Sequence, residues 1–150
     1  MKYSVFFKAP TGFEAYTEAA GCYFDCAGKI LLLKRHVSRP QGETWGVPAG
    51  KLEPGETARQ AVIREVFEEI GVDISDGVAE IGKLYVQLPH IGYIFHMFYR
   101  QLSSEPELSL GLAEHTEARW VTLKDALDLP LIAGGKEALA FYQSYLAKLF

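Results

Sequence analysis

Three glutamates lie close together near the middle of the chain, at spacings that could support metal chemistry. Glu65, Glu68 and Glu69 stand at positions i, i+3 and i+4, so in a helix their carboxylates share one face. Like charges at this spacing repel one another by roughly 0.2–0.5 kcal/mol per pair. With no His or Cys beside them, such oxygen ligands favour a hard cation such as Mg²⁺ or Mn²⁺. The alternative is a solvated acidic face, which is common on surface helices.

The residues around these glutamates predict a helix from about Ala58 to Ile70. Thr57 is a suitable N-cap, Gln60 completes a capping box with it, and Gly71 stands where a glycine commonly ends a helix. The acidic residues then occupy the last two turns, where the helix dipole disfavours negative charge by about 0.3–1 kcal/mol. An apolar stripe would bury the helix, and its expected members are Val62, Val66 and Ile70, joined by Ala58, Ile63 and Phe67.

The sequence flanking the glutamates distinguishes a metal site from an acidic face. Residues Gly50 to Val72 read GKLEPGETARQAVIREVFEEIGV, which resembles the Nudix box, Gly-x5-Glu-x7-Arg-Glu-U-x-Glu-Glu-x-Gly-U, where U is a bulky apolar residue. Seven single-residue requirements, each met by background usage at about 5–7%, coincide by chance on the order of 10⁻⁹ per start site. The matching positions are Gly50, Glu56, Arg64, Glu65, Val66, Glu68, Glu69, Gly71 and Val72.

This resemblance to the Nudix hydrolase family implies a role for each charged residue of the box. The glutamate matching Glu56 and the arginine matching Arg64 usually brace one another and the catalytic glutamates, a supporting role that orients metal ligands. The metal ligands that the resemblance implies are the carboxylates of Glu65, Glu68 and Glu69 and the backbone carbonyl of Gly50.

The chemistry that the resemblance implies is cleavage of a diphosphate linkage in a small nucleotide-like molecule, either a nucleoside diphosphate derivative or a nucleoside triphosphate analogue. Mg²⁺, or Mn²⁺ in its place, would neutralise the phosphate oxygens and acidify a bound water, and a carboxylate would accept the proton. Glu65 is one candidate base. The other candidate base is Glu114, six residues before Trp120 in the stretch LAEHTEARWV, which is also a candidate metal ligand. Glu117 is a weaker candidate for the same roles. Either loop acid could instead be an exposed residue without a role.

Other polar residues have two interpretations that the sequence leaves open. Lys34, Arg35 and Arg39 precede the box and are either phosphate contacts or solvated surface charges. The histidines have no metal-ligand spacing to one another, so surface or core positions are expected for His36, His90, His96 and His115.

Apolar and polar patterning predicts strands over 15–24, 29–35, 78–88, 91–102 and 118–121, with a short extended piece at 45–48. Helices are expected over 122–127 and 136–149 in addition to the central one. This order predicts a mixed α/β domain with a helix on each side of a sheet. The resemblance implies a Nudix-type α/β/α sandwich with a mixed β-sheet, and we expect residues 1–150 to form a single domain.

Charge and composition narrow the classes of partner. The formal net charge is −4 and no lysine and arginine cluster offsets it, so long nucleic acid is not an expected partner. No apolar run approaches the ~20 residues that span a bilayer, and the first residues make a poor signal peptide. A cytoplasmic protein is therefore expected. The aromatic residues Tyr3, Phe6 and Phe7 are candidates for a homodimer interface.

Cys22 and Cys26 are the two cysteines, four residues apart on a predicted strand. That spacing separates them by about 13 Å, whereas a disulfide requires less than about 7 Å between Cα atoms, so free thiols are expected. The alternative to an enzyme is a Nudix-fold module that binds or senses a nucleotide without cleaving it. Such modules often lose box glutamates, and this chain keeps all of them.

Overall fold

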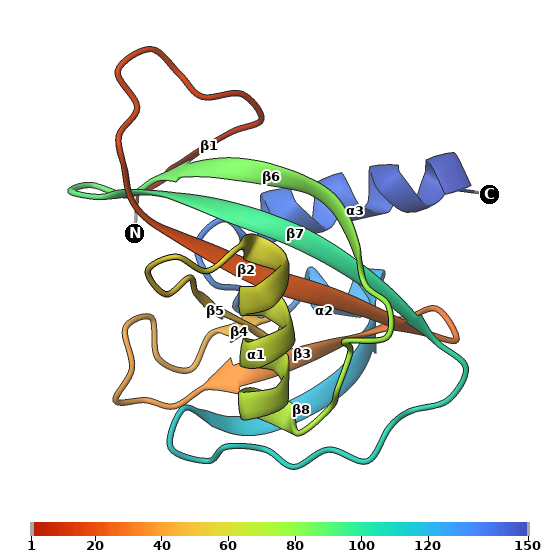
Figure 1. Cartoon of the computed structure of the whole chain (residues 1–150). Helices are drawn as coiled ribbons and strands as arrows, with labels where there is room; N and C mark the ends of the chain where they lie inside the picture. Colours follow the sequence, from red (N-terminus) through yellow and green to blue (C-terminus); the bar gives the residue numbers. More distant parts are fainter. Residues whose placement is uncertain (1, 150) are drawn as a thin grey trace.

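An eight-stranded mixed sheet forms the centre of the computed structural model, which describes residues 2–149 (Figure 1). Its main path runs β1-β6-β7-β2-β3-β4, while β5 pairs with β2 and β8 pairs with β3. The long central pair β2 and β7 is parallel and the other pairs are antiparallel, which confirms the expected mixed sheet. The strands are β1 (Ser4–Phe6), β2 (Ala15–Cys26), β3 (Lys29–Arg35), β4 (Trp45–Gly46), β5 (Ala49–Lys51), β6 (Ala79–Gln87), β7 (Gly92–Leu102) and β8 (His115–Thr122).

The strands β2 and β3 separate beyond their connecting turn, and β5 lies in the place between them. The two strands pair only beside their connecting turn, at Asp25 with Ile30 and Cys26 with Lys29. Further along, β5 takes the place next to β2, with Gly50 opposite Ala20, while β3 pairs with β4 and β8. The segment that enters the central helix therefore starts from the middle of the sheet rather than from an edge.

The helix α1 (Ala58–Ile70) has the predicted bounds and the predicted caps. The hydroxyl of Thr57 accepts from the backbone N–H of Gln60 at 3.1 Å, and the Gln60 side chain accepts from the Thr57 N–H at 2.9 Å. Gly71 ends the helix in the left-handed region, with φ of 73°, which a glycine adopts without strain. These local interactions fix where the helix begins and ends.

One face of α1 packs on the sheet. Val62, Val66 and Ile70 are fully buried against side chains of β2, β3 and β7, as predicted. Phe67 is predicted to join this stripe, and this prediction is wrong: the residue is 58% exposed. It follows Val66 by one position, a rotation of about 100° around the helix, which turns its side chain away from the sheet.

The helices α2 (Leu123–Ala126) and α3 (Gly135–Leu149) lie on the opposite side of the sheet from α1 (Figure 1). Tyr142 of α3 is fully buried and stacks on Tyr23 with ring centroids 4.7 Å apart. The expected α/β/α sandwich is therefore confirmed. Within residues 2–149, no helix is both long enough and apolar enough to cross a membrane.

Both cysteines are free and buried, as expected from their spacing. Burial raises the pKa of the Cys22 thiol far above its ordinary value, so this thiol stays protonated and unreactive near neutral pH.

Candidate active site

Arg64 of α1 holds the loop between β5 and α1. Its Nε and Nη2 donate to the two carboxylate oxygens of Glu56 at 2.8 and 2.9 Å, and Nη2 also donates to the carbonyl of Lys51 at 3.0 Å. Glu56 in turn accepts from the backbone N–H of Glu53 at 2.9 Å. The hydrogen bond with Arg64 is the main reason that the pKa of Glu56 falls to about 2. We call Arg64, Glu56 and the Lys51 carbonyl the arginine brace.

The same guanidinium contacts two of the three helix glutamates. Nη1 of Arg64 lies 2.8 Å from Oε1 of Glu65 and 3.2 Å from Oε2 of Glu68. The Glu65 side chain is 15% exposed and the Glu68 side chain 57% exposed. Burial raises the pKa of Glu65, and the contact with Arg64 opposes this rise. The structure therefore places Glu65 inside the site and Glu68 at its solvent edge.

Gly50 lies directly against Glu65. A Cβ atom at position 50 would overlap the Glu65 carboxylate, so any other residue would displace one of the two. The glycine is needed here because of close approach, not because of an unusual backbone conformation. It allows the backbone of β5 and the last turns of α1 to meet where the site forms.

Glu69 is the most deeply buried carboxylate of the box, with 5% of its surface exposed. Its Oε1 accepts from the backbone N–H of Ala49 at 3.0 Å. Burial is the largest cause that raises the pKa of Glu69 to about 9; the Ala49 hydrogen bond opposes the rise, and the neighbouring charges of Glu65 and Glu114 add to it. The protein therefore buries an acid without supplying enough positive charge to balance it.

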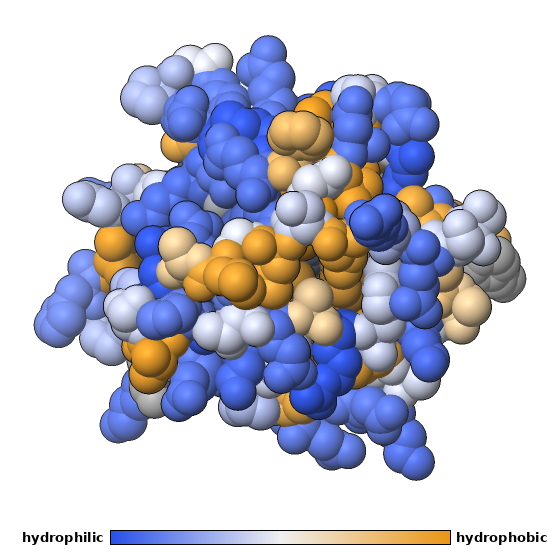
Figure 2. Space-filling view, turned by 90° about the horizontal axis from the view of Figure 1, so that it is seen from below, coloured by the Kyte–Doolittle hydropathy of each residue, from blue (hydrophilic) through white to orange (hydrophobic). Residues whose placement is uncertain are grey.

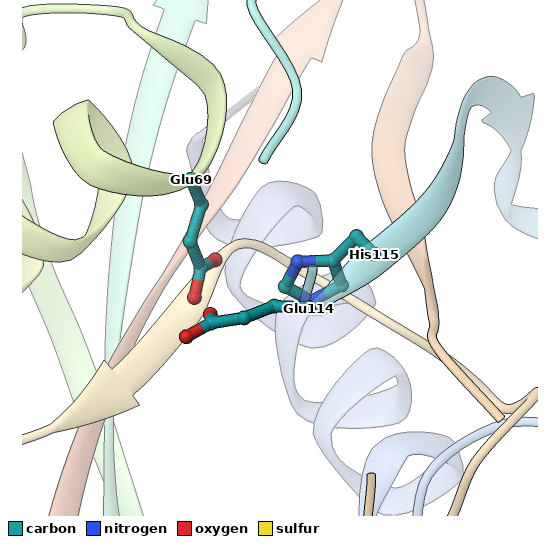
Figure 3. A group of neighbouring side chains, drawn as sticks. All are labelled: Glu69, Glu114 and His115. Carbon is teal, nitrogen blue, oxygen red and sulfur yellow. The ribbon is translucent and has the colours of Figure 1, made fainter. Parts of the chain in front are cut away.

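Glu114 and His115 complete a cluster with Glu69. The three residues offer ligand atoms that all lie within 4.8 Å of one another, and Figure 3 shows their side chains converging from the end of α1 and the start of β8. Glu114 is exposed, whereas His115 is 6% exposed. Burial is the main cause that lowers the pKa of His115. We call these three residues the Glu69 cluster.

Backbone hydrogen bonds fix the connection from β7 to β8, which carries Glu114. The N–H groups of Ser109 and Gly111 donate to the carbonyls of Ile70 and Glu69 at 2.9 and 3.1 Å. They thereby satisfy two of the carbonyls that the end of a helix leaves without partners. Glu114 is thus positioned by the same helix that carries Glu69. Seen from the side of this connection, the surface is mainly hydrophilic around an apolar area (Figure 2).

Arg35 lies at the end of β3, opposite His115 in the pairing of β3 with β8. Its Nε donates to the carbonyl of Pro40 at 2.8 Å, and its charge acts on both Glu69 and Glu114. The other loop acid considered from the sequence, Glu117, lies outside the Glu69 cluster and forms an ion pair with Arg119 at 2.6 Å. Of the two loop acids, the structure brings only Glu114 to the site.

The residues present fit a divalent cation. Two carboxylates and an imidazole lie within reach of a single ion, and one of these carboxylates is buried without adequate positive charge. Nδ1 of His115 is buried and has no hydrogen-bond partner within residues 2–149, although buried polar atoms are normally paired. The spacing of the histidines to one another does not indicate His115. The adjacent Glu114 was the available signal.

The NUDIX domain family model matches residues 15–142. The chain belongs to the Nudix hydrolase family. It is 31% identical over 118 residues to the CTP pyrophosphohydrolase of Escherichia coli (strain K12), covering 76% of this chain and 82% of that relative. It is also 25% identical over 134 residues to the dihydroneopterin triphosphate diphosphatase of Haemophilus influenzae (strain ATCC 51907 / DSM 11121 / KW20 / Rd), covering 80% and 82%.

A solved structure shows the same architecture. The solution structure of the E. coli ORF135 protein superposes with a TM-score of 0.75 at 26% identity and covers 93% of this chain and 96% of that one. Members of the family cleave pyrophosphate bonds in nucleotide derivatives. This Nudix hydrolase therefore belongs among the pyrophosphohydrolases.

Proposed function

We propose that this Nudix hydrolase cleaves a nucleoside triphosphate, or a close analogue of one, to the monophosphate and pyrophosphate in a Mg²⁺-dependent reaction. The observation that carries the proposal is the Glu69 cluster, with a buried carboxylate whose charge is not balanced by the protein. The names of the two relatives described above, one for CTP and one for dihydroneopterin triphosphate, support a triphosphate substrate.

The charges of substrate and site explain why a cation is needed. A triphosphate carries several negative charges, and the site presents further carboxylates, so the two repel one another. A bound Mg²⁺, or Mn²⁺ in its place, would neutralise phosphate oxygens and acidify a coordinated water. The groups that would hold it are the carboxylates of Glu68, Glu69 and Glu114 and the backbone carbonyl of Gly50.

We assign the role of general base to Glu65. Arg64 contacts Oε1 of Glu65, which orients the carboxylate and leaves the second oxygen as the candidate proton acceptor. Partial burial raises the pKa of Glu65, and a carboxylate with a raised pKa is a stronger base at neutral pH. Glu114 lies in the Glu69 cluster and is assigned to cation binding. A pH profile of turnover in Glu65→Gln and Glu114→Gln separates these roles, because only loss of the base should abolish its limb of the profile.

Arg35 is the candidate contact for the outer phosphates. Its positive charge lies near Glu69 and Glu114, where a polyphosphate bridged by the cation would extend. Arginine suits this role because its guanidinium can bind phosphate oxygens in pairs. Arg35→Gln should therefore raise KM more than it lowers kcat.

The test is product analysis on a panel of possible substrates. The pure protein would be incubated with Mg²⁺ and CTP, other ribo- and deoxynucleoside triphosphates, oxidised dNTPs, dihydroneopterin triphosphate, ADP-ribose and nucleotide sugars, and products followed by ³¹P NMR. We expect pyrophosphate and a monophosphate from at least one triphosphate, only with the cation present. Turnover confined to ADP-ribose or a nucleotide sugar would contradict the triphosphate assignment. Tight nucleotide binding without any turnover would favour the non-catalytic module.

A further inference from the structure

His115 is a buried histidine that lies beside two acids of the candidate site, Glu69 and Glu114. The ring of His36 forms a hydrogen bond with Ser38, with Nδ1 2.7 Å from the hydroxyl oxygen. His96, which is also buried, has Nε2 2.7 Å from a carboxylate oxygen of Glu18. Nδ1 of His96 has no hydrogen-bond partner but lies 3.7 Å from a carboxylate oxygen of Glu80, so that ring stands between two acids. Nδ1 of His115 likewise has no hydrogen-bond partner in the part of the chain that the structure describes, and the acids beside this ring are Glu69 and Glu114. Leaving a buried polar atom unpaired costs about 1–3 kcal/mol, so its place calls for an explanation.

The position of His115 supplies one. It begins β8, and its N–H donates to the carbonyl of Gly111 at 3.1 Å, so the backbone that carries the ring is fixed. The ring lies beside the side chain of Glu114, and the side chain of Glu69 extends toward both of them (Figure 3). A ligand atom of the imidazole lies within 4.8 Å of an oxygen of each carboxylate, close enough for one ion to contact all three groups.

We propose that His115 is a nitrogen ligand of a divalent cation held together with Glu69 and Glu114. The proposal rests on the function proposed above and deepens it, since it concerns the identity of the cation at that site. None of the roles that the Nudix box implies falls on position 115, which lies outside the box.

An imidazole ligand changes which cation the site prefers. Mg²⁺ favours oxygen ligands and is held through carboxylates and waters, whereas imidazole nitrogen suits transition metals better. A site with two carboxylates and one imidazole should therefore bind Mn²⁺ and Co²⁺ more tightly than Mg²⁺. We expect Co²⁺ to bind more tightly than Mn²⁺, because affinity for a site with nitrogen and oxygen ligands rises from Mn²⁺ to Co²⁺.

Electron spin-echo envelope modulation on the intact protein loaded with one equivalent of Mn²⁺ tests the proposal directly. The wild-type spectrum should show coupling to a directly bound ¹⁴N nucleus, and labelling the histidines with ¹⁵N should change that pattern. His115→Gln should abolish the coupling and weaken Mn²⁺ binding by about tenfold or more, with a smaller change in Mg²⁺ binding. His36→Gln is the matched control and should retain the coupling. Near-UV circular dichroism verifies that each variant is folded. The ¹⁵N-labelled wild type tests for a histidine ligand without any substitution.

Each contrary outcome has a separate meaning. Mn²⁺ bound by the wild type without nitrogen coupling, or coupling that survives in His115→Gln, would overturn the assignment of His115 and leave the proposed hydrolase intact. Mn²⁺ binding that is undetectable, or that Glu69→Gln does not weaken, would overturn the cation site itself and the proposed function with it.

Discussion

The arginine brace and the Glu69 cluster contain the same kind of side chain in opposite electrostatic conditions. In the brace, the guanidinium of Arg64 contacts Glu56 through two hydrogen bonds and brings its pKa to about 2. In the cluster, burial without enough positive charge raises the pKa of Glu69 to about 9. Both groups adjoin α1, and five positions separate Arg64 from Glu69. Carboxylates whose charge the protein balances hold the loop in place, and the carboxylates left without such balance lie where we propose that an external cation binds.

The largest expected effect comes from removing charge in the Glu69 cluster. Glu69→Gln keeps an oxygen to accept from Ala49 N–H but loses the negative charge, so turnover should fall on the order of 10³-fold, about 4 kcal/mol in activation free energy. Steady-state kinetics with saturating Mg²⁺ measures this. If activity stayed within tenfold of wild type, the cluster would not be the catalytic cation site.

The same substitution should stabilise the metal-free protein at neutral pH. The folded pKa of Glu69, about 9, exceeds the ordinary value of 4.5, so the unfolded chain releases this proton first as pH rises. The resulting penalty is absent below about pH 4.5 and grows up to about pH 9, reaching at most about 3 kcal/mol at pH 7. Urea denaturation with EDTA at pH 5, 7 and 9 should show an advantage for Glu69→Gln that increases with pH.

Glu56→Gln should lower the stability of the protein at neutral pH, whereas Glu69→Gln should raise it. The folded pKa of Glu56 lies below its ordinary value, so the charged form stabilises the fold above about pH 4.5 and loses this contribution as pH falls toward 2. The variant should therefore be less stable than wild type at pH 7, and the difference should shrink in acid. Equal pH trends for the two glutamine variants would contradict the distinction between brace and cluster.

A smaller loss is expected from changing the shape of the brace without changing its charge. Arg64→Lys cannot reproduce the paired contacts with Glu56 together with those to Glu65 and the loop, so turnover should fall about 10–100-fold. Arg59→Lys is the matched control, since Arg59 lies on the same helix and donates instead to the carbonyl of Val78. Similar kinetics for both lysine variants would argue that Arg64 contributes only its charge.

The smallest effect should come from the other end of α1. Thr57→Ala removes the hydroxyl of the capping box and should reduce the free energy of unfolding by about 1 kcal/mol, while kcat at a temperature far below unfolding stays unchanged. Urea denaturation and steady-state kinetics on the same sample check both expectations. A parallel loss of kcat would mean that the beginning of the helix also positions the site.

Local signals allowed α1 to be predicted with its caps, because Thr57, Gln60 and Gly71 interact with residues only a few positions away. The short strands were harder. Neither β1 nor the pairing of β5 with β2 follows from the sequence pattern. Both strands have only three residues and form through partners that are distant in sequence. The sequence placed the start of β8 at Ala118, whereas the strand begins at His115, because its first residues pair with the end of β3.

The candidate site divides in the same way. Box residues could be assigned expected roles from their spacing along one helix, and the structure brings Glu56, Arg64 and Glu65 into contact. The approach of Glu114 and His115 to Glu69 depends on a connection whose path is set by long-range hydrogen bonds, so a pattern in sequence could nominate Glu114 but not exclude Glu117. Phe67 was misplaced for a related reason, since apolar character alone does not say which side of a helix meets the sheet.

The attachment of Ser109 and Gly111 to the end of α1 divides the connection between β7 and β8 into two unequal parts. The stretch before Ser109 is free to lengthen, because an insertion there would loop outward beyond the first anchor point. The stretch from Gly111 to His115 has a set length, and one extra residue in it would shift the carboxylate of Glu114 away from Glu69. The first stretch can therefore change in length while Glu114 keeps its place beside Glu69.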